Sequence, residues 1–476
     1  MITPESPDRL YSTRLRTALV LTGSGTAGAY QAGVLRALHE AGIRIDLVAG
    51  RGVGVANAMF AAMDGGARLW DAKGIWRSPS ARRYYRWRSS LRIAGWAFAV
   101  CGAILALPLA VLAVAVVIAL AGMLLTFIGL GRAGAAATAA YAAWTQELFA
   151  AGALPTIVPR LAVVAALIAL GAALLAIVRP LVSPAARRRA AYGLAGRVLG
   201  GPLAATELVA TCSNELWNLI RGAAPLTSPP AAELSRRYAE LVAENLGQPG
   251  FRELLITAHD MDARRDLVFA LLGPAHRPRF FTRPGPEGAM RLAEAFDLAG
   301  VARDHALDAL AGALALPIGA EPPLIAFAPE GPWKGEAHRL CDRPGGLARL
   351  FEEVAAAGAE QVIVATALPP QGKPHELSSE RGDLRGHAGE SLSAFEAAGL
   401  RDVLEQWTGR FAGLFVIRPT HNPLGPLDFD GIYDERSDRA HTLGELVDRG
   451  YEDAYRQFIE PVVAASGDRL QSPVGS

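Results

Sequence analysis

Residues 17–62 read TALVLTGSGTAGAYQAGVLRALHEAGIRIDLVAGRGVGVANAMFAA and contain two short apolar runs, each of which ends in a glycine-rich turn. The runs Ala18–Leu21 and Ile45–Ala49 have the length and composition of buried strands, and the apolar residues of Ala29–Ala41 have helical spacing. The segment therefore predicts a strand, a turn and a helix, followed by a second strand, turn and helix.

Further apolar runs follow residue 250, and a helical pattern over Gly345–Ala357 leads into one of them. The runs expected to be buried strands are Leu254–Thr257, Leu324–Ala328, Gln361–Thr366 and Leu414–Ile417. Strands that alternate with helices are typical of the α/β class with a mainly parallel sheet. Between the two regions, Gly201–Gly250 is expected to form irregular helices with a break at Ser228–Pro230.

Composition indicates that part of the chain lies in lipid. The 476 residues are 51% hydrophobic, and the mean hydropathy is +0.22, which is more apolar than a soluble enzyme needs. Charge is nearly balanced, with 47 Lys and Arg against 46 Asp and Glu, so no global field favours a nucleic-acid partner. The widely spaced Cys101, Cys212 and Cys341 offer neither a disulfide framework nor a zinc spacing.

Two uncharged stretches are candidates for membrane spans. Ile93–Gly131 and Leu161–Val178 contain no Asp, Glu, Lys or Arg, and about 20 apolar residues suffice to cross a bilayer as a helix. The first stretch could be one tilted helix kinked at Pro108, a tight hairpin, or a buried core helix. Met1–Arg16 is polar and lacks a secretory signal, so the anchor is expected within the chain and the first domain on the cytoplasmic side.

Arginines flank the apolar stretches on both outer sides. They are Arg82, Arg83, Arg86, Arg88 and Arg92 before the first stretch and Arg187, Arg188 and Arg189 after the second. Under the positive-inside rule both flanks are cytoplasmic, and the number of spans is then even. We expect two spans with Ala133–Pro159 as an outer loop, with four spans as the alternative. The expected soluble domain has two parts, residues 1–90 and 186–476. Between them, residues 91–185 form the expected transmembrane insert, with spans at about 93–131 and 160–180.

The first glycine turn has the pattern G-x-G-x-x-G, formed by Gly23, Ser24, Gly25, Thr26, Ala27 and Gly28. Such a turn fits a dinucleotide pyrophosphate loop, an oxyanion hole for acyl transfer, or a structural turn. A dinucleotide site expects an acidic residue at the end of the second strand, whereas Asp46 stands at its beginning. The pattern therefore favours acyl transfer.

The second turn has the spacing of a nucleophile elbow with glycine at its centre. It reads Gly50-Arg51-Gly52-Val53-Gly54, and an elbow needs small residues on both sides of its strained central position. Gly50 and Gly54 supply those small neighbours.

The two turns, the joining Ala-Tyr-Gln-Ala-Gly-Val-Leu helix and the Asn57-Ala58 pair resemble the patatin-like phospholipases. The resemblance is close over 17–62 and looser over 254–268 and 312–366. It implies a patatin-like three-layer α/β fold, interrupted here by a transmembrane helical insert. It also implies a link to lipid metabolism, membrane lipids or acyl ligands as partners, no cofactor, and the activity of a serine lipid acyl hydrolase.

Three departures from the family pattern bear on that activity. The family's nucleophilic serine falls on Gly52, and the basic residue of its oxyanion loop falls on Ala27. The candidate for its catalytic acid is Asp342 in Cys-Asp-Arg-Pro-Gly-Gly, where Arg-Pro interrupts the usual motif; Asp342 could equally be a surface acid. Asp64-Gly65-Gly66 spells the motif but comes too early, and a helix C-cap is the better interpretation. We therefore expect hydrolysis to be impaired.

Two alternatives stay open at this point. The chain could be an active lipid hydrolase with an unrecognised nucleophile, or a nucleotide-binding membrane protein that uses the first turn. Polar residues in suggestive surroundings are Ser24, Ser213, His259, His338, Asp342 and His421. The histidines lack the spacing of a metal motif, so no metal site is predicted.

Overall fold

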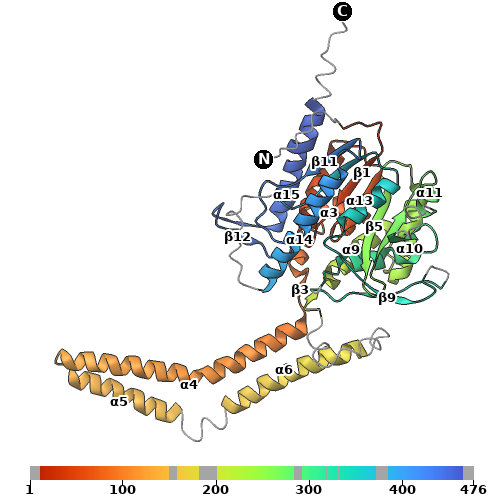
Figure 1. Ribbon diagram of the computed structural model, residues 1–476. Helices are drawn as coiled ribbons and strands as arrows, with labels where there is room; N and C mark the ends of the chain where they lie inside the picture. Colours follow the sequence, from red (N-terminus) through yellow and green to blue (C-terminus); the bar gives the residue numbers. More distant parts are fainter. Residues whose placement is uncertain are drawn as a thin grey trace, which may run out of the picture. The chain divides into compact units, whose positions relative to one another are not determined.

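The computed structural model describes residues 11–148, 158–181, 201–282, 292–317, 319–329, 333–370 and 384–464 (Figure 1). The chain divides into two compact units. Unit 1 consists of Met1–Arg86 and Leu203–Ser476, and unit 2 is Trp87–Pro202.

Unit 1 is built on a nine-stranded sheet, whose main path has the order β11-β10-β1-β2-β5-β6-β7. The strands are β1 Thr17–Leu21, β2 Leu47–Arg51, β5 Glu253–Asp260, β6 Arg265–Leu271, β7 Ala293–Asp297, β8 Leu324–Ala326, β9 Ala337–Cys341, β10 Gln361–Ala365 and β11 Gly413–Ile417. Neighbours on the main path pair in parallel, except β5 with β6. The predicted α/β class with a mainly parallel sheet is confirmed.

One predicted strand differs from expectation. The run Leu324–Ala328 gives only the short β8, which pairs antiparallel with β9 at the side of the sheet. Strand β9 in turn pairs antiparallel with β5. Because β9 reads Ala-His-Arg-Leu-Cys, it lacks the continuous apolar run by which a buried strand is recognised in a sequence.

The helices of unit 1 cover both faces of the sheet (Figure 1). They are α1 Ala27–Glu40, α2 Gly54–Ala61, α3 Ala67–Trp70, α9 Thr206–Arg221, α10 Ala231–Asn245, α11 Arg277–Phe281, α12 Ala306–Leu314, α13 Leu347–Ala356, α14 Leu384–Trp407 and α15 Leu443–Ala454. Short elements are η1 Pro79–Arg83, β3 Arg86–Trp87, β4 Leu203–Ala204, η2 Arg303–His305, β12 Ile432–Asp434, β13 Arg439–His441 and η3 Tyr455–Ile459. The helices expected over 201–250 and the break at Ser228–Pro230 are confirmed, although α9 and α10 are regular rather than irregular.

Helices pack tightly enough to fix the positions of both glycine turns. On one face, Val20 and Ala49 of the sheet lie in a buried cluster with Phe351 of α13 and Trp407 of α14. On the other, α1 packs against α2 and α15. Contact between α1 and α15 is so close that a Cβ on Gly33 would lie 1.8 Å from the Val447 carbonyl oxygen.

Unit 2 consists of three helices, α4 Ser89–Phe127, α5 Gly131–Leu148 and α6 Val158–Leu181. Helix α4 is continuous, so the first uncharged stretch is one helix and not a tight hairpin. Its segment Leu109–Phe127 is long and apolar enough to cross a membrane, and only 6% of it is buried, unlike a core helix. The described part of α6 contains a shorter apolar stretch, Val163–Ala172.

The first part of the expected outer loop at Ala133–Pro159 is helical and forms α5, while residues 149–157 lie outside the described residues. Helix α5 packs along α4: the Tyr141 hydroxyl donates to the Val111 carbonyl at 2.7 Å, and a Cβ on Gly134 would lie 2.7 Å from the Gly122 carbonyl oxygen. Alanine has the highest helix propensity, so an Ala-rich segment of modest hydropathy can be helical where hydropathy alone predicts a loop. Helix α6 also contacts α4, and together α5 and α6 return along it (Figure 1).

Candidate active site

The two glycine turns lie next to each other at the carboxyl ends of β1 and β2. These strands are parallel neighbours, and Leu21 is in register with Gly50 where they end. In open α/β sheets, ligands bind outside the carboxyl ends of the strands. The loop 23–28 and the turn at Gly52 therefore form the candidate site, although its residues are buried.

The turn at Gly52 has the backbone of a nucleophile elbow. Gly52 lies between β2 and α2 with φ +57°, where residues with side chains are strained. Its neighbours must be small, because a Cβ on Gly54 would lie 2.1 Å from the Leu21 carbonyl oxygen and one on Gly50 would lie 2.8 Å from the Val55 Cα. A side chain at any of these three glycines would therefore be strained or would clash with neighbouring atoms.

Asp342 lies beside Gly52 and is not a surface acid. A Cβ on Gly52 would lie 3.1 Å from Asp342 Oδ2, and Asp342 is 2% exposed. The residue follows β9, and its N–H donates to the Ala315 carbonyl at 2.8 Å after the end of α12. The inserted Arg343 turns outward to an ion pair with Asp266 of β6 at 2.9 Å. The insertion therefore leaves the candidate acid at the elbow.

Arg51, the residue before Gly52, binds this acid at two points. Its Nε donates to Asp342 Oδ1 at 3.1 Å and its Nη2 to Oδ2 at 2.7 Å, while Nη2 also donates to Glu396 Oε1 of α14 at 2.8 Å. Burial opposes the charge on Arg51, but Asp342 and Glu396 outweigh burial and raise the pKa of the guanidinium above its usual value. Arg51 is thus a permanent cation between two carboxylates.

Ser24 completes a buried set that we call the Arg51 cluster: Ser24, Arg51, Asp342 and Glu396. The Ser24 hydroxyl donates to Glu396 Oε1 at 2.7 Å and lies 3.5 Å from Asp342 Oδ2. With one guanidinium and two carboxylates, the cluster contains more negative than positive groups. Ser24 is 2% exposed and its hydroxyl is already bonded to Glu396, so it is not a free donor for a nucleotide phosphate at the first glycine turn.

The glycine loop turns a carbonyl toward the elbow. Val53 N–H donates to the Gly23 carbonyl at 3.0 Å, and that oxygen would lie 2.5 Å from a Cβ on Gly52. In hydrolase elbows, the N–H after the nucleophile helps to bind the oxyanion. At this turn the N–H of Val53 is already engaged.

A second segment covers the loop from the outside. Thr26 N–H donates to the Pro426 carbonyl at 3.0 Å, and the Thr26 hydroxyl donates to the Gly425 carbonyl at 2.8 Å. The contact is close, because a Cβ on Gly25 would lie 1.7 Å from the Pro426 carbonyl oxygen. Ala27, where the family keeps a basic residue, is buried at the start of α1. The cation of the site comes instead from Arg51.

The other polar candidates have partners elsewhere. Ser213 bonds within α9 to the Val209 carbonyl at 2.8 Å. The histidines pair with carboxylates: His259 with Asp266 at 2.8 Å, His338 with Asp260 at 2.6 Å and His421 with Asp434 at 3.2 Å. No group of three or more side chains suited to a metal ion is found among the residues that the structure describes.

Asp64 serves as a turn residue after α2. It adopts φ +52°, and the following Gly65 N–H donates to the Phe60 carbonyl at 2.8 Å, closing the end of the helix. The Asp-Gly-Gly motif at this position therefore has a structural explanation.

Sequence reasoning missed Arg51 and Glu396 as members of the site. One signal for Arg51 was present, since a charge at the end of a buried apolar strand requires a buried counter-charge. Glu396 gave no comparable signal, because it stands within a helix with an ordinary mixture of polar residues.

Comparison with known proteins agrees with the site geometry. Residues 19–100 match the family model of the patatin-like phospholipases, and this match includes both glycine turns. This part of the chain is therefore similar to the patatin-like phospholipases.

The chain is similar to the crystal structure of VipD from Legionella pneumophila, with 12% sequence identity, coverage of 95% of this chain and 67% of that one, and a TM-score of 0.29. So low a TM-score supports no argument about function. No curated protein matches the chain.

Proposed function

We propose that this protein is a membrane-anchored, patatin-like protein of lipid metabolism that binds a lipid or acyl ligand and has little or no serine hydrolase activity. One observation carries the proposal: Asp342 lies 3.1 Å from the Cβ position of residue 52, where glycine offers no hydroxyl. In a serine–aspartate dyad the acid takes the proton of the attacking hydroxyl. Asp342 instead holds Arg51 at two points, and accepting a proton would break that pair.

The loop geometry supports the same conclusion. Stabilisation of an oxyanion needs N–H groups aimed at the developing charge. At this elbow the Val53 N–H is bonded to Gly23, and the Gly23 carbonyl faces the position where a reacting group would lie. Loss of one oxyanion donor lowers turnover by about 10²–10³.

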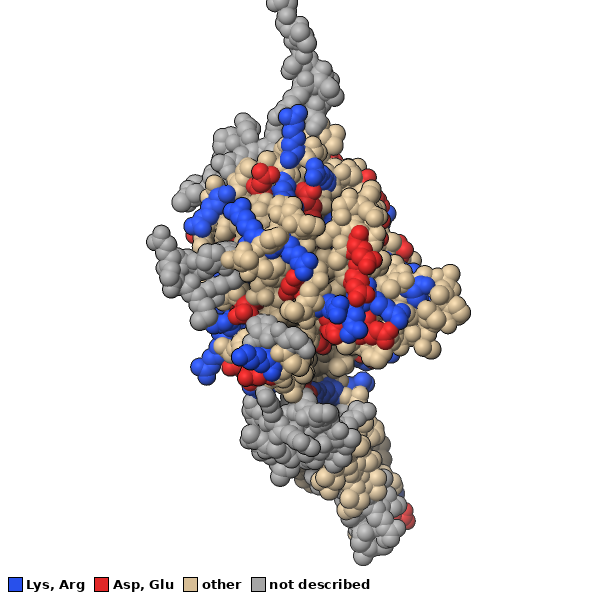
Figure 2. All heavy atoms as spheres, turned by 90° about the vertical axis from the view of Figure 1, so that its right-hand side faces the viewer, with Lys and Arg blue, Asp and Glu red and all other residues tan. Residues whose placement is uncertain are grey.

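Membrane anchoring is supported by unit 2. Large apolar side chains of α4 are exposed, among them Leu109, Val117 and Leu124, and such a surface needs lipid or a partner. By contrast, acidic and basic side chains are interspersed over unit 1 on the face shown in Figure 2. Strand β2 precedes unit 2 in the chain and pairs with β5, which follows it. If the chain crosses a membrane within unit 2, it must therefore cross back before β5.

Orientation follows from charge. Arg82, Arg83 and Arg86 are exposed before α4. Under the positive-inside rule this supports a cytoplasmic location for that flank and for unit 1. The second arginine group at 187–189 lies outside the described residues.

The test uses the full-length protein in detergent. We expect no covalent capture by a fluorophosphonate probe and no turnover of nitrophenyl butyrate or of phospholipid in mixed micelles. Mass spectrometry of lipids that copurify after extensive washing should find an acyl ligand. Robust turnover by the wild-type protein would contradict the loss of hydrolysis, and absence of any bound lipid would contradict the binding function.

Ser24 supports a second candidate function, that of an active hydrolase with a displaced nucleophile. Its hydroxyl is 2.7 Å from Glu396 Oε1, which is the contact expected of a serine and its base. Against this, Ser24 is 2% exposed and the same Glu396 oxygen accepts a bond from Arg51. Probe capture that disappears in Ser24→Ala but persists in Ser213→Ala would establish this alternative.

A further inference from the structure

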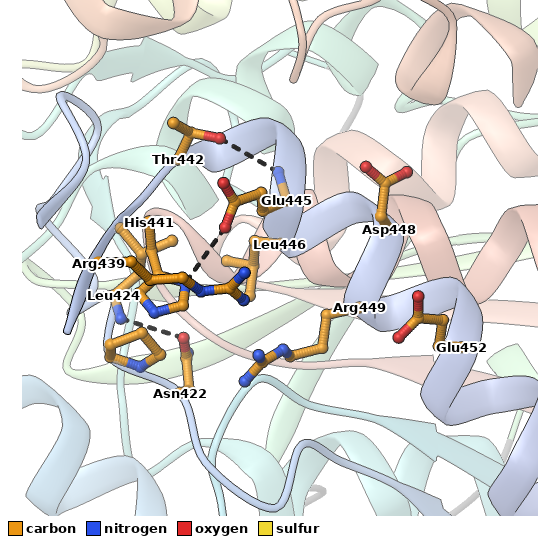
Figure 3. A pocket seen from close by; sticks show the side chains of 11 residues that line it. Asn422, Leu424, Arg439, His441, Thr442, Glu445, Leu446, Asp448, Arg449 and Glu452 are labelled. Carbon is orange, nitrogen blue, oxygen red and sulfur yellow. Dashed lines mark hydrogen bonds and ion pairs between the residues drawn. The ribbon is translucent and has the colours of Figure 1, made fainter. Parts of the chain in front are cut away.

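A polar cavity of about 150 Å³ lies apart from the Arg51 cluster, between the segment 422–424, strand β13 and helix α15 (Figure 3). Asn422, Arg439, His441, Thr442, Glu445 and Arg449 are among the residues that line it. A single water needs about 10–15 Å³ measured in the same way, so the cavity has room for a small polyatomic ligand.

Two arginines project into the same part of this cavity (Figure 3). Arg449 extends from α15, and its Nη1 donates to the His421 carbonyl at 2.7 Å; Arg439 comes from β13. Neither guanidinium has an ion-pair partner within the part of the chain that the structure describes. Two cations that converge without a carboxylate between them repel each other, and an anion would relieve that repulsion.

The acidic side chains of the cavity do not lie between these arginines. Glu445 bonds to His441 Nδ1 at 3.1 Å, and Asp448 forms an ion pair with Arg77. In Figure 3 the carboxylate of Glu452 lies on the other side of Arg449 from Arg439. In this view, no labelled carboxylate lies between the guanidinium groups of Arg439 and Arg449.

We propose that this cavity binds a phosphate group between Arg439 and Arg449. A guanidinium presents parallel N–H donors that match phosphate oxygens, and a phosphate has enough oxygens to engage two guanidinium groups at once. The side-chain amide of Asn422 already donates to the Ala367 carbonyl at 3.0 Å. The proposed donors to the phosphate oxygens are therefore the two guanidinium groups. The phosphate could be free or part of a lipid headgroup, and both sources present the same chemistry.

The experiment measures thermal unfolding of the full-length protein in neutral detergent at constant ionic strength. One arm titrates inorganic phosphate against chloride; the other titrates dioleoyl phosphatidic acid against phosphatidylcholine in the micelles. We expect a saturable rise of several degrees in Tm in at least one arm. A response to phosphate alone identifies a free phosphate, and a response to phosphatidic acid alone identifies a lipid headgroup.

Variants separate binding from folding. Arg439→Gln should abolish the rise without lowering the Tm of the ligand-free protein, because its guanidinium stabilises no neighbour by an ion pair among the described residues. Arg449→Lys should weaken the response, since it keeps the charge but loses the planar fork. The control is Arg401→Gln, which removes one exposed arginine of α14 that does not line the cavity and should respond like wild type. An unchanged response in Arg439→Gln, or no rise in either arm, would overturn the proposal.

Discussion

Arg51 and Asp342 form a buried two-point ion pair next to Gly52, with contacts of 3.1 Å and 2.7 Å. The arginine belongs to the elbow itself and the aspartate comes from a segment 291 residues further along the chain. In this arrangement the elbow glycine and the ion pair serve a structural role together, because Arg51 links β2, the end of β9 and, through Glu396, helix α14.

Arg51→Met should destabilise unit 1 by about 3–5 kcal/mol, because removal of one partner leaves buried charges uncompensated. Asp342 and Glu396 would both lose their cation. Thermal unfolding or urea unfolding in detergent measures the effect. Arg401→Gln, at an exposed pair with Asp402, should change stability by less than about 0.5 kcal/mol. Equal stability of the two variants would mean that the Arg51 pair does not support the fold.

Gly54→Ala should destabilise the protein by about 1–3 kcal/mol, because the added Cβ would lie 2.1 Å from the Leu21 carbonyl oxygen and force the elbow apart. Gly444→Ala is the matched control, since its Cβ would come no closer than 3.9 Å to Thr442 Oγ1. Thermal melts compare the two. A Gly54→Ala variant as stable as Gly444→Ala would show that α2 does not pack against β1 as described.

Ser24→Ala should cost about 1.5–3 kcal/mol, the range for a hydrogen bond to a charged group. From the sequence alone, a serine between two glycines indicates turn chemistry and predicts no loss. The structure alters that expectation, because the Ser24 hydroxyl bonds to a buried carboxylate from α14, 372 residues away in the sequence. A melt unchanged from wild type would restore the sequence-based interpretation.

These residues show where sequence reasoning succeeds and where it stops. The strand, the two turns and the elbow glycines were predictable because each depends on residues close together in the chain: Gly52 needs positive φ, and Gly50 and Gly54 need room. Asp342 could be nominated only from a family motif that its own neighbours disrupt. Glu396 could not be found, since no local pattern reveals which carboxylate a distant helix brings to Arg51.

Unit 2 shows a different limit. Hydropathy predicted an apolar helix over the first stretch, and α4 agrees. The segment from Ala133 was expected to be a loop because it connects the two uncharged stretches, yet α5 forms there and packs against α4. Helix pairing depends on close contacts such as that of Gly122 with Gly134, which a window average of hydropathy does not register.

The turn between α4 and α5 should lie across the membrane from unit 1. A membrane-impermeant maleimide should label Leu130→Cys and Ser391→Cys from opposite sides, with Ser391→Cys labelled from the cytoplasm. The variants need only Cys101→Ala as background, because burial raises the pKa of the Cys212 and Cys341 thiols to about 12 and keeps them unreactive. Labelling of both positions from the same side would contradict a span at Leu109–Phe127.

Gly52→Ser should fail to restore more than a trace of ester hydrolysis, and it should lower the Tm. A serine at φ +57° is strained, and its Cβ would lie 2.5 Å from the Gly23 carbonyl oxygen. The acid beside it is held by Arg51, and the Val53 N–H is unavailable to an oxyanion. Three separate features would therefore have to change before the hydroxyl could react.

Turnover of nitrophenyl butyrate and capture by a fluorophosphonate probe measure the outcome. Gly52→Ala carries the same backbone strain without the hydroxyl and serves as the matched control, so any excess of Gly52→Ser over Gly52→Ala reports chemistry at the new side chain. Adding Arg51→Ala to Gly52→Ser frees Asp342 and should raise a trace rate if the fold survives. Hydrolysis of the ester by Gly52→Ser at about 10³-fold or more above Gly52→Ala would contradict this expectation. The chain would then lack only its nucleophile, and neither the bonded Val53 N–H nor the pair of Arg51 with Asp342 would prevent catalysis.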